Sequence, residues 1–204
     1  MLSVTVTGNI ASGKSSLLRV WARAGVPVIS ADDLARAVVE PGTAGLREVV
    51  RVFGDEVLEP DGQLDRGRLR DLVFRDDDAR RRLESILHPR IRDLREAWLR
   101  EQGRRGVELV AAEIPLLFET GYARRVDVTI VVDAPPAVRL ERLVRLRGLD
   151  GEEAARIMST QANAGDTRAL ADHVIPNDGT PAEFERRALE LLARLRARIR
   201  RERG

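Results

Sequence analysis

The chain has 204 residues, of which 43% are hydrophobic and 33% charged, a composition typical of a soluble globular protein large enough for one α/β domain. It has no cysteine and two histidines, which excludes disulfides and thiolate chemistry and argues against a histidine-built zinc site. The net charge is only +2, so the basic composition is weak evidence for nucleic-acid binding. A strand pattern begins at Leu2, and no apolar run is long enough to span a membrane. We therefore expect a cytoplasmic protein with no nucleic-acid or membrane partner; the oligomeric state is not indicated.

The stretch from Val4 to Leu18 is the most informative part of the chain. A β-branched run ends at Gly8 and is followed by the spacing Gly-x4-Gly-Lys-Ser, with a helical pattern after it. This is the phosphate-binding P-loop in its required context of strand, loop and helix. We expect the loop to bind the phosphates of ATP through nine residues: Gly8, Asn9, Ile10, Ala11, Ser12, Gly13, Lys14, Ser15 and Ser16.

Two side chains of this loop have distinct expected roles. The ammonium of Lys14 can reach the β- and γ-phosphates, and the hydroxyl of Ser15 can bind Mg²⁺. Lys14 is also the only lysine in the chain, so the other 34 of the 35 basic residues are arginines. Codon bias explains the general excess of arginine. The one exception lies where a compact ammonium on a flexible stem is needed.

The remaining elements follow in chain order. A helix is predicted over 15–24 and a strand over 26–30, so the two strands and their helix form a βαβ unit with a parallel sheet. A short helix follows over 33–40. Over 46–102 only helical patterns occur, at 46–53, 66–74, 76–87 and 90–102, with an interruption at His88-Pro89. Strands are predicted at 107–112, 126–132 and 173–175, and helices at 136–146, 152–160 and 181–201.

Carboxylates at two strand ends are candidates for chemistry. Asp32 follows the second strand, where it could accept the proton of an attacking hydroxyl or serve only as a helix N-cap. Asp33 is the better candidate for a mere cap. Glu113 ends the third strand, where it could help to hold Mg²⁺ or be an ordinary solvated carboxylate.

Arginines near the end of the helix 136–146 could cover a transferring phosphoryl group. Arg142, Arg145 and Arg147 all qualify, but in a chain so rich in arginine any helix face will show some. His88 lies beside a proline, and a lone histidine is more often a structural hydrogen-bond partner than a catalyst.

Several motifs in order resemble those of bacterial dephospho-CoA kinases. Besides the loop, they are Ser30-Ala31-Asp32-Asp33-Leu34-Ala35-Arg36, Leu83-Glu84-x-Ile86-Leu87-His88-Pro89-x-Ile91, Ile114-Pro115-Leu116-Leu117-Phe118-Glu119 and Ala171-Asp172-x-Val174-Ile175-x-Asn177-x-Gly179. Three positions depart from the family pattern: Asn9 and Ala11 replace two glycines, and Ser30 replaces an aspartate.

The resemblance implies an α/β P-loop kinase fold, a five-stranded parallel sheet flanked by helices. It implies a core over about 1–45, 104–139 and 170–204, a helical substrate-binding insertion over about 46–103 and a helical lid over about 140–169. The implied activity is ATP- and Mg²⁺-dependent phosphorylation of the ribose 3′-hydroxyl of dephospho-CoA, the final step of coenzyme A biosynthesis.

The resemblance also assigns expected roles to individual residues. Asp32 would be the catalytic base, Arg147 or Arg145 the lid arginine, and Asn177 and Gly179 would lie near the adenine of ATP. The acceptor would be bound by Asp32, Arg36, His88, Pro115 and Leu116. Two rivals remain: another P-loop small-molecule kinase, of the nucleoside monophosphate type, and a non-enzymatic nucleotide-dependent nucleic-acid binder.

Overall fold

The computed structural model describes residues 1–113, 127–162 and 167–203. Within it the chain forms two compact units. The first consists of Met1–Ser30 and Gln102–Gly204, and the second of Ala31–Glu101. The second unit overlaps the expected insertion over 46–103, whose boundaries stay a prediction. Each unit is described below by itself.

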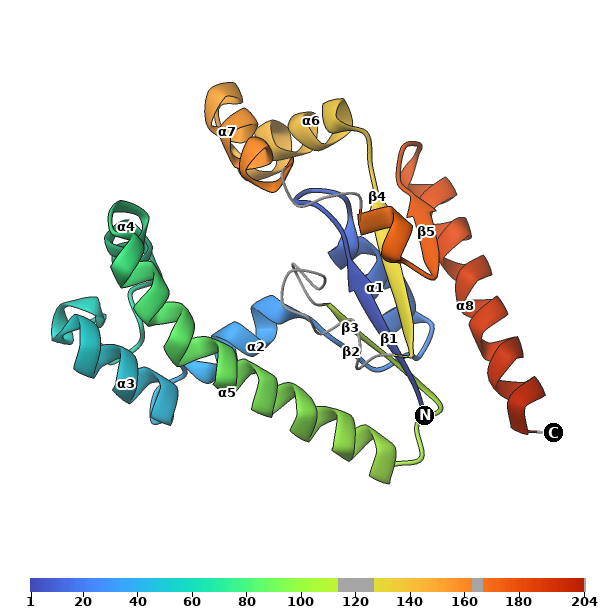
Figure 1. Ribbon diagram of the computed structural model, residues 1–204, viewed down its shortest axis with the longest axis horizontal. Coiled ribbons are helices and arrows are strands. Elements are labelled where there is room, and N and C mark those ends of the chain that lie inside the picture. Colours follow the sequence, from blue (N-terminus) through green and yellow to red (C-terminus); the bar gives the residue numbers. More distant parts are fainter. Residues whose placement is uncertain (114–126, 163–166, 204) are drawn as a thin grey trace. The chain divides into compact units, whose positions relative to one another are not determined.

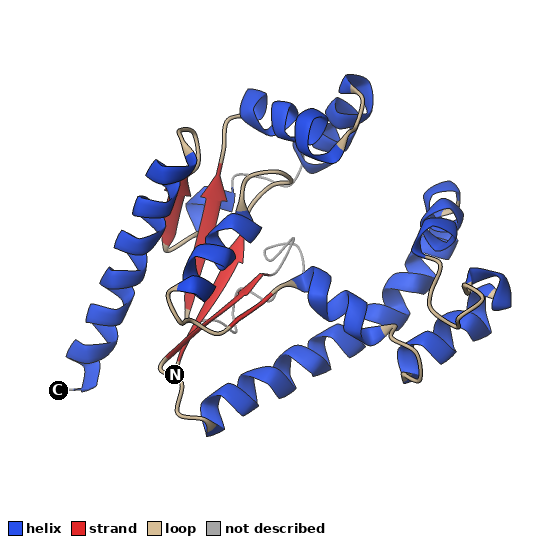
Figure 2. Cartoon of the chain, turned by 180° about the vertical axis from the view of Figure 1, so that it is seen from behind, coloured by secondary structure: helices blue, strands red, loops and turns tan. Residues whose placement is uncertain are grey.

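The first unit is built on a five-stranded sheet. Its strands are β1 (Leu2–Thr7), β2 (Val28–Ile29), β3 (Leu109–Glu113), β4 (Val128–Asp133) and β5 (His173–Pro176). The spatial order is β2-β3-β1-β4-β5, and every neighbouring pair is parallel (Figures 1 and 2). The predicted five-stranded parallel sheet is therefore confirmed. Because β1 is central, the loop that follows it lies between the carboxyl ends of β3 and β4, where open α/β sheets bind ligands.

Among the described residues of this unit, five helical segments accompany the sheet: α1 (Lys14–Arg23), α6 (Pro136–Arg147), α7 (Gly151–Ala162), η3 (Thr167–Leu170) and α8 (Pro181–Arg203). Helices α1 and α8 pack with the apolar side chains of the sheet into one core. Its largest member is Trp21, which is fully buried and donates from Nε1 to the carbonyl of Ala188 at 2.9 Å. This bond ties the helix after the P-loop to the last helix of the chain.

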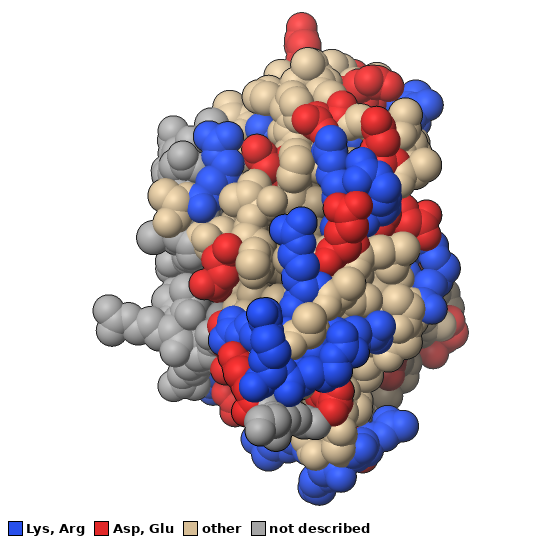
Figure 3. Space-filling model, turned by 90° about the vertical axis from the view of Figure 1, so that its right-hand side faces the viewer, with Lys and Arg blue, Asp and Glu red and all other residues tan. Residues whose placement is uncertain are grey.

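Basic and acidic side chains lie side by side on the face that α8 presents to solvent (Figure 3). Arg186 pairs with Glu190 and Arg198 with Glu202, each one helical turn apart. The excess of arginine along α8 is thus partly balanced by its own carboxylates. Among the described residues, no helix is both long and apolar enough to cross a membrane.

The second unit is helical and has its own core. It contains α2 (Ala31–Val38), α3 (Ala44–Phe53), η1 (Asp55–Val57), α4 (Arg66–Arg75) and α5 (Asp77–Arg104), which runs past the end of the unit. Side-chain caps begin two of the helices: Thr43 accepts from the Leu46 amide at 3.1 Å, and Asp65 from the Arg68 amide at 2.8 Å. The fully buried Val49 and Val57 are members of this core.

The predicted interruption at His88-Pro89 is wrong, because α5 continues through Pro89. A proline inside a helix has no N–H and crowds the carbonyl four residues earlier, which usually breaks or kinks the helix. Here the guanidinium of Arg90 donates to the carbonyl of Ile86 at 2.7 Å. The carbonyl that loses its N–H partner at Pro89 is that of Ser85, so this bond is a neighbouring contact and does not replace the missing hydrogen bond.

Candidate active site

The loop after β1 adopts a backbone path that side chains rarely permit. Gly8 has a φ of +141° and Gly13 a φ of +109°, and Ala11 takes a left-handed φ of +58°. A Cβ on Gly8 would collide with the carbonyl oxygen of Val132, and one on Gly13 with the side-chain amide of Asn177. The two glycines of the motif are thus required both by their φ angles and by close neighbours.

Lys14 lies in the first turn of α1 and turns back over the loop. Its Nζ donates to the carbonyl oxygens of Gly8 at 2.9 Å and Asn9 at 3.1 Å. The same Nζ is 3.8 Å from Oε1 of Glu113 at the end of β3. Both side chains are nearly buried, with 13% and 11% of their surface exposed, so little water screens this pair. The lysine and a strand-end carboxylate therefore meet at the loop.

The two serines beside Lys14 differ in their surroundings. Ser15 is exposed at the start of α1, where the positive end of the helix dipole favours an anion. Ser16 is partly buried, and its hydroxyl accepts from Nη2 of Arg19 at 3.1 Å.

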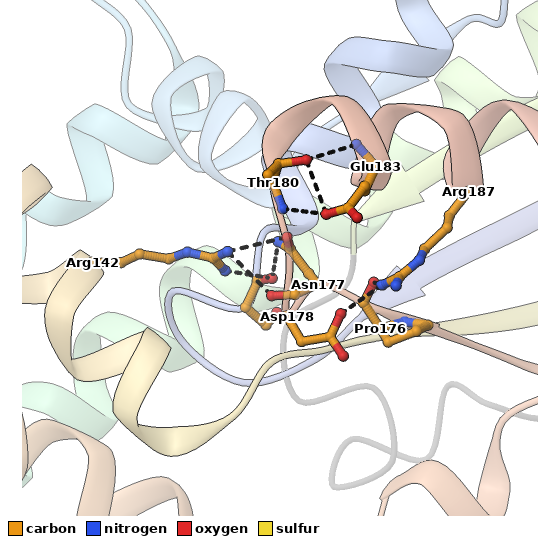
Figure 4. A network of polar contacts seen from close by, with 8 residues as sticks. Arg142, Pro176, Asn177, Asp178, Thr180, Glu183 and Arg187 are labelled. Atoms are coloured by element: carbon orange, nitrogen blue, oxygen red, sulfur yellow. Dashed lines mark hydrogen bonds and ion pairs between the residues drawn. The ribbon is translucent and has the colours of Figure 1, made fainter.

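Two further side chains contact the middle of the loop (Figure 4). Nδ2 of Asn177 donates to the carbonyl of Ser12 at 2.7 Å. Arg142 on α6 donates from Nη1 to the carbonyls of Ala11 and Ser12 at 3.2 and 3.3 Å. Its Nη2 donates to the backbone and side-chain oxygens of Asn177 at 3.2 and 3.1 Å. Burial lowers the pKa of Arg142, and the nearby charge of Glu141 partly opposes this shift.

The turn between β5 and α8 is itself braced by ion pairs and caps. Arg187 donates to the carbonyl of Pro176 at 2.8 Å and to Oδ1 of Asp178 at 2.6 Å. Oε2 of Glu183 accepts from the amide and hydroxyl of Thr180 at 2.7 and 2.9 Å. A Cβ on Gly179 would collide with that same carboxylate. The turn that carries Asn177 and Gly179 is therefore fixed close to the P-loop.

The arginines of α6 do not all face the loop. Arg142 does, although the sequence favoured Arg147 and Arg145. Arg145 is exposed, and its Nε lies 3.7 Å from Oε1 of Glu141 on the same helix. Arg147 ends α6, and its side chain lies outside what the structure describes. No local sequence signal distinguishes Arg142, because its partners in the loop are 130 and 131 residues away.

The other predicted residues belong to the second unit or lie outside the described residues. Asp32 and Arg36 are exposed on α2, and His88 is exposed on α5. Because α2 begins at Ala31, Asp32 and Asp33 both lie in its first turn. Pro115 and Leu116 fall within 114–126, outside the described residues.

Comparisons with known proteins identify the family. A family model for dephospho-CoA kinases matches residues 2–183, nearly the whole chain. The chain belongs to the dephospho-CoA kinase family. A dephospho-CoA kinase of Thermobifida fusca is 44% identical over 199 residues, covering 98% of each chain. One from Anaeromyxobacter dehalogenans is 44% identical over 196 residues, covering 96% of this chain and 93% of the relative.

Solved structures give the same result for the fold. Protein TT1252 of Thermus thermophilus matches with a TM-score of 0.78 and 36% identity, covering 95% of this chain and 97% of that one. A dephospho-CoA kinase from Campylobacter jejuni matches with a TM-score of 0.72 and 26% identity, covering 95% and 96%. Shikimate kinase from Bacteroides thetaiotaomicron, at a TM-score of 0.51 and 17% identity, shares the fold alone. This dephospho-CoA kinase family member thus has a P-loop kinase fold.

Proposed function

We propose that the protein transfers the γ-phosphoryl group of ATP to the ribose 3′-hydroxyl of dephospho-CoA, giving CoA and ADP. The full-length match to dephospho-CoA kinases, around a loop with the backbone geometry of a phosphate site, supports this proposal most strongly. It would be the final step of coenzyme A biosynthesis, carried out in the cytoplasm on small molecules.

In this proposal the loop from Gly8 to Ser16 binds the triphosphate. Its turned backbone and the start of α1 present N–H groups and a positive dipole end to an anion. Lys14 already lies against the loop and needs only to extend from its carbonyls to meet the β- and γ-oxygens. Asn177 and Gly179, in the turn beside the loop, would lie near the adenine.

The Mg²⁺ that such a reaction uses would be held by the exposed hydroxyl of Ser15, together with phosphate oxygens and water. Among the described residues there is no cluster of three or more histidine, cysteine or carboxylate side chains that could hold a metal alone. This agrees with a site that is completed by the nucleotide, because Mg²⁺ commonly keeps several waters and takes few protein ligands. When bound, the ion supplies charge neutralisation on the phosphates. Glu113 would contribute indirectly, through its contact with Lys14.

The acceptor would be bound by Asp32, Arg36 and His88 of the second unit, together with Pro115 and Leu116. Asp32 is proposed to accept the proton of the 3′-hydroxyl, or to orient it for in-line attack on the γ-phosphorus. Arg36, His88 and the residues Pro115 and Leu116 would contribute to binding of dephospho-CoA. A lid arginine, Arg147 or Arg145, would neutralise charge on the transferring group.

A direct assay tests the substrate assignment. The protein is incubated with ATP, Mg²⁺ and either dephospho-CoA or one of a panel of nucleoside monophosphates, and ADP and CoA are quantified. We expect ADP and CoA to appear in equal amounts with dephospho-CoA, and little ADP with the monophosphates. Equal ADP formation with a monophosphate would contradict the assignment and favour the other class of small-molecule kinase.

The neighbouring carboxylates of α2 provide a matched pair for the catalytic base. Asp32 and Asp33 are both exposed in the first turn, so each contributes similarly to the helix dipole. We expect Asp32→Asn to lower kcat by about 100-fold or more, while the affinity for ATP is kept. Asp33→Asn should stay close to wild type. A near-normal kcat for Asp32→Asn would exclude its role as base.

A further inference from the structure

The carbonyl oxygens of the P-loop are held by side chains on two sides. Lys14 takes those of Gly8 and Asn9, at 2.9 and 3.1 Å. Asn177 and Arg142 contact those of Ala11 and Ser12: Nδ2 of Asn177 is 2.7 Å from the Ser12 oxygen, and Nη1 of Arg142 is 3.2 Å from the Ala11 oxygen.

The direction of a carbonyl fixes the direction of the next N–H. In a trans peptide the C=O of one residue and the N–H of the following residue point in opposite directions. With its oxygen held by Asn177, the Ser12–Gly13 peptide must point its N–H away from Asn177 and Arg142. We propose that Asn177 and Arg142 are positioning residues that orient the loop peptides for the triphosphate before it binds. This inference rests on the proposed binding of ATP at this loop.

Support from outside the loop matters most where the backbone of the loop is least favourable. Ala11 has a φ of +58°, which is unfavourable for a residue with a Cβ and persists only where neighbours maintain it. Gly13, at the N-cap of α1, provides no side-chain cap. Arg142 contacts the carbonyl of Ala11 itself and that of the next residue, Ser12.

Asn177 is itself rigidly placed. Only 6% of its surface is exposed, and its backbone N–H donates to the carbonyl of Asp133 at 2.7 Å, at the end of β4. Arg142 carries only donors, so its contact with Oδ1 at 3.1 Å leaves Nδ2 to face Ser12. The arginine therefore determines which end of the amide reaches the loop (Figure 4).

Inorganic tripolyphosphate separates this role from a contact with the base of the nucleotide. A residue that only touches the base contributes nothing to the binding of tripolyphosphate, whereas a residue that orients the loop contributes to both ligands. The variant Asn177→Leu removes the donor without adding charge and keeps a similar side-chain volume. Affinities for ATP and tripolyphosphate, each with Mg²⁺, are measured by calorimetry, and the melting temperature confirms folding.

We expect Asn177→Leu to weaken the binding of both ligands by a similar factor, about tenfold, because the Ser12 carbonyl loses its shorter hydrogen bond and keeps only the longer one from Arg142. In ¹⁵N-glycine-labelled protein the amide resonance of Gly13 should also shift before any ligand is added. The matched control is Arg196→Leu on α8. It removes a hydrogen bond of 2.9 Å to the carbonyl of Ala24 and does not involve the loop. This control should bind both ligands like wild type.

A second variant keeps the inference testable if Asn177→Leu does not fold. Arg142→Lys retains the positive charge but cannot contact four oxygens at once, so weaker tripolyphosphate binding would reflect geometry rather than charge. Wild-type affinity for tripolyphosphate in these variants, with or without weaker ATP binding, would overturn the inference. Failure of the wild-type protein to bind either ligand would overturn the proposed function as well.

Discussion

Gly13 has a φ of +109° and lies against the side-chain amide of Asn177, so any side chain there would meet two separate obstacles. We expect Gly13→Ala to lose nucleotide binding and to lower the melting temperature. The control is Gly106→Ala, which has a φ of +70° but nothing within 4 Å of its added Cβ. It should show only the backbone cost of about 1–2 kcal/mol. Equal effects of the two substitutions would mean that the contact with Asn177 is unimportant.

Asp178 provides a pH-dependent test of the turn beside the loop. The hydrogen bond from Arg187, together with a backbone bond, lowers the pKa of the Asp178 carboxyl below its ordinary value of about 3.9. A carboxyl group whose pKa is lowered by folding stabilises the fold at pH values above its unfolded-state pKa. This stabilisation is lost as the pH falls through its folded-state pKa.

Arg187→Gln should therefore lower the melting temperature most at pH 7. The difference in melting temperature from wild type should shrink as the pH falls below about 4. A smaller difference should remain at low pH, because the bond from Arg187 to the Pro176 carbonyl is also lost. Thermal melts between pH 7 and pH 3 measure it. Arg194→Gln, on an exposed position of the same helix, controls for the change in net charge. A difference in melting temperature between Arg187→Gln and wild type that grows toward low pH would contradict a lowered pKa of Asp178.

At the scale of single elements, Pro89 is the clearest departure from expectation. A proline in a helix interior costs about 3 kcal/mol relative to alanine. We expect Pro89→Ala to stabilise the protein against urea. Arg90→Ala should change stability by a similar amount in the wild type and in the Pro89→Ala background, because its bond goes to the carbonyl of Ile86 and not to that of Ser85, which Pro89 leaves without a partner. A much smaller effect of Arg90→Ala in the Pro89→Ala background would show that the side chain compensates for the proline.

The sequence predicts elements well where a pattern is local. A nearly all-apolar run identified β3, a continuous β-branched run identified β4, and the spacing of glycines and lysine identified the loop within one stretch of chain. At Pro89 the local rule was wrong, because Ile86 and Ile91, on either side of the proline, pack into the core of the second unit and tertiary packing overrides the local preference. Contacts between distant residues leave no local pattern: Asn177 and Ser12 are 165 residues apart, and Arg142 is one of 34 arginines. Arg142 and Asn177 were both candidates in the sequence, but their contacts with the loop emerge only from the fold.

At the scale of the whole molecule, the chain contains two separate cores. Val4 on β1 belongs to the core of the first unit, Val49 on α3 belongs to that of the second, and both are fully buried. The proposed ATP phosphates are bound by the first unit and the proposed base Asp32 is carried by the second. Substitutions in the two cores should therefore affect binding and turnover differently.

Truncating one valine in each core tests this separation. Each of Val4→Ala and Val49→Ala should cost about 2 kcal/mol, the effect of removing two buried methyl groups and leaving a cavity. In hydrogen exchange, Val49→Ala should speed exchange of amides within Ala31–Glu101 and leave those of β1 and β4 protected. ATP affinity should persist in that variant while turnover falls, whereas Val4→Ala should weaken ATP binding. If both substitutions raise exchange equally throughout the chain, the two units unfold as one cooperative body, and binding and turnover cannot be separated by their cores.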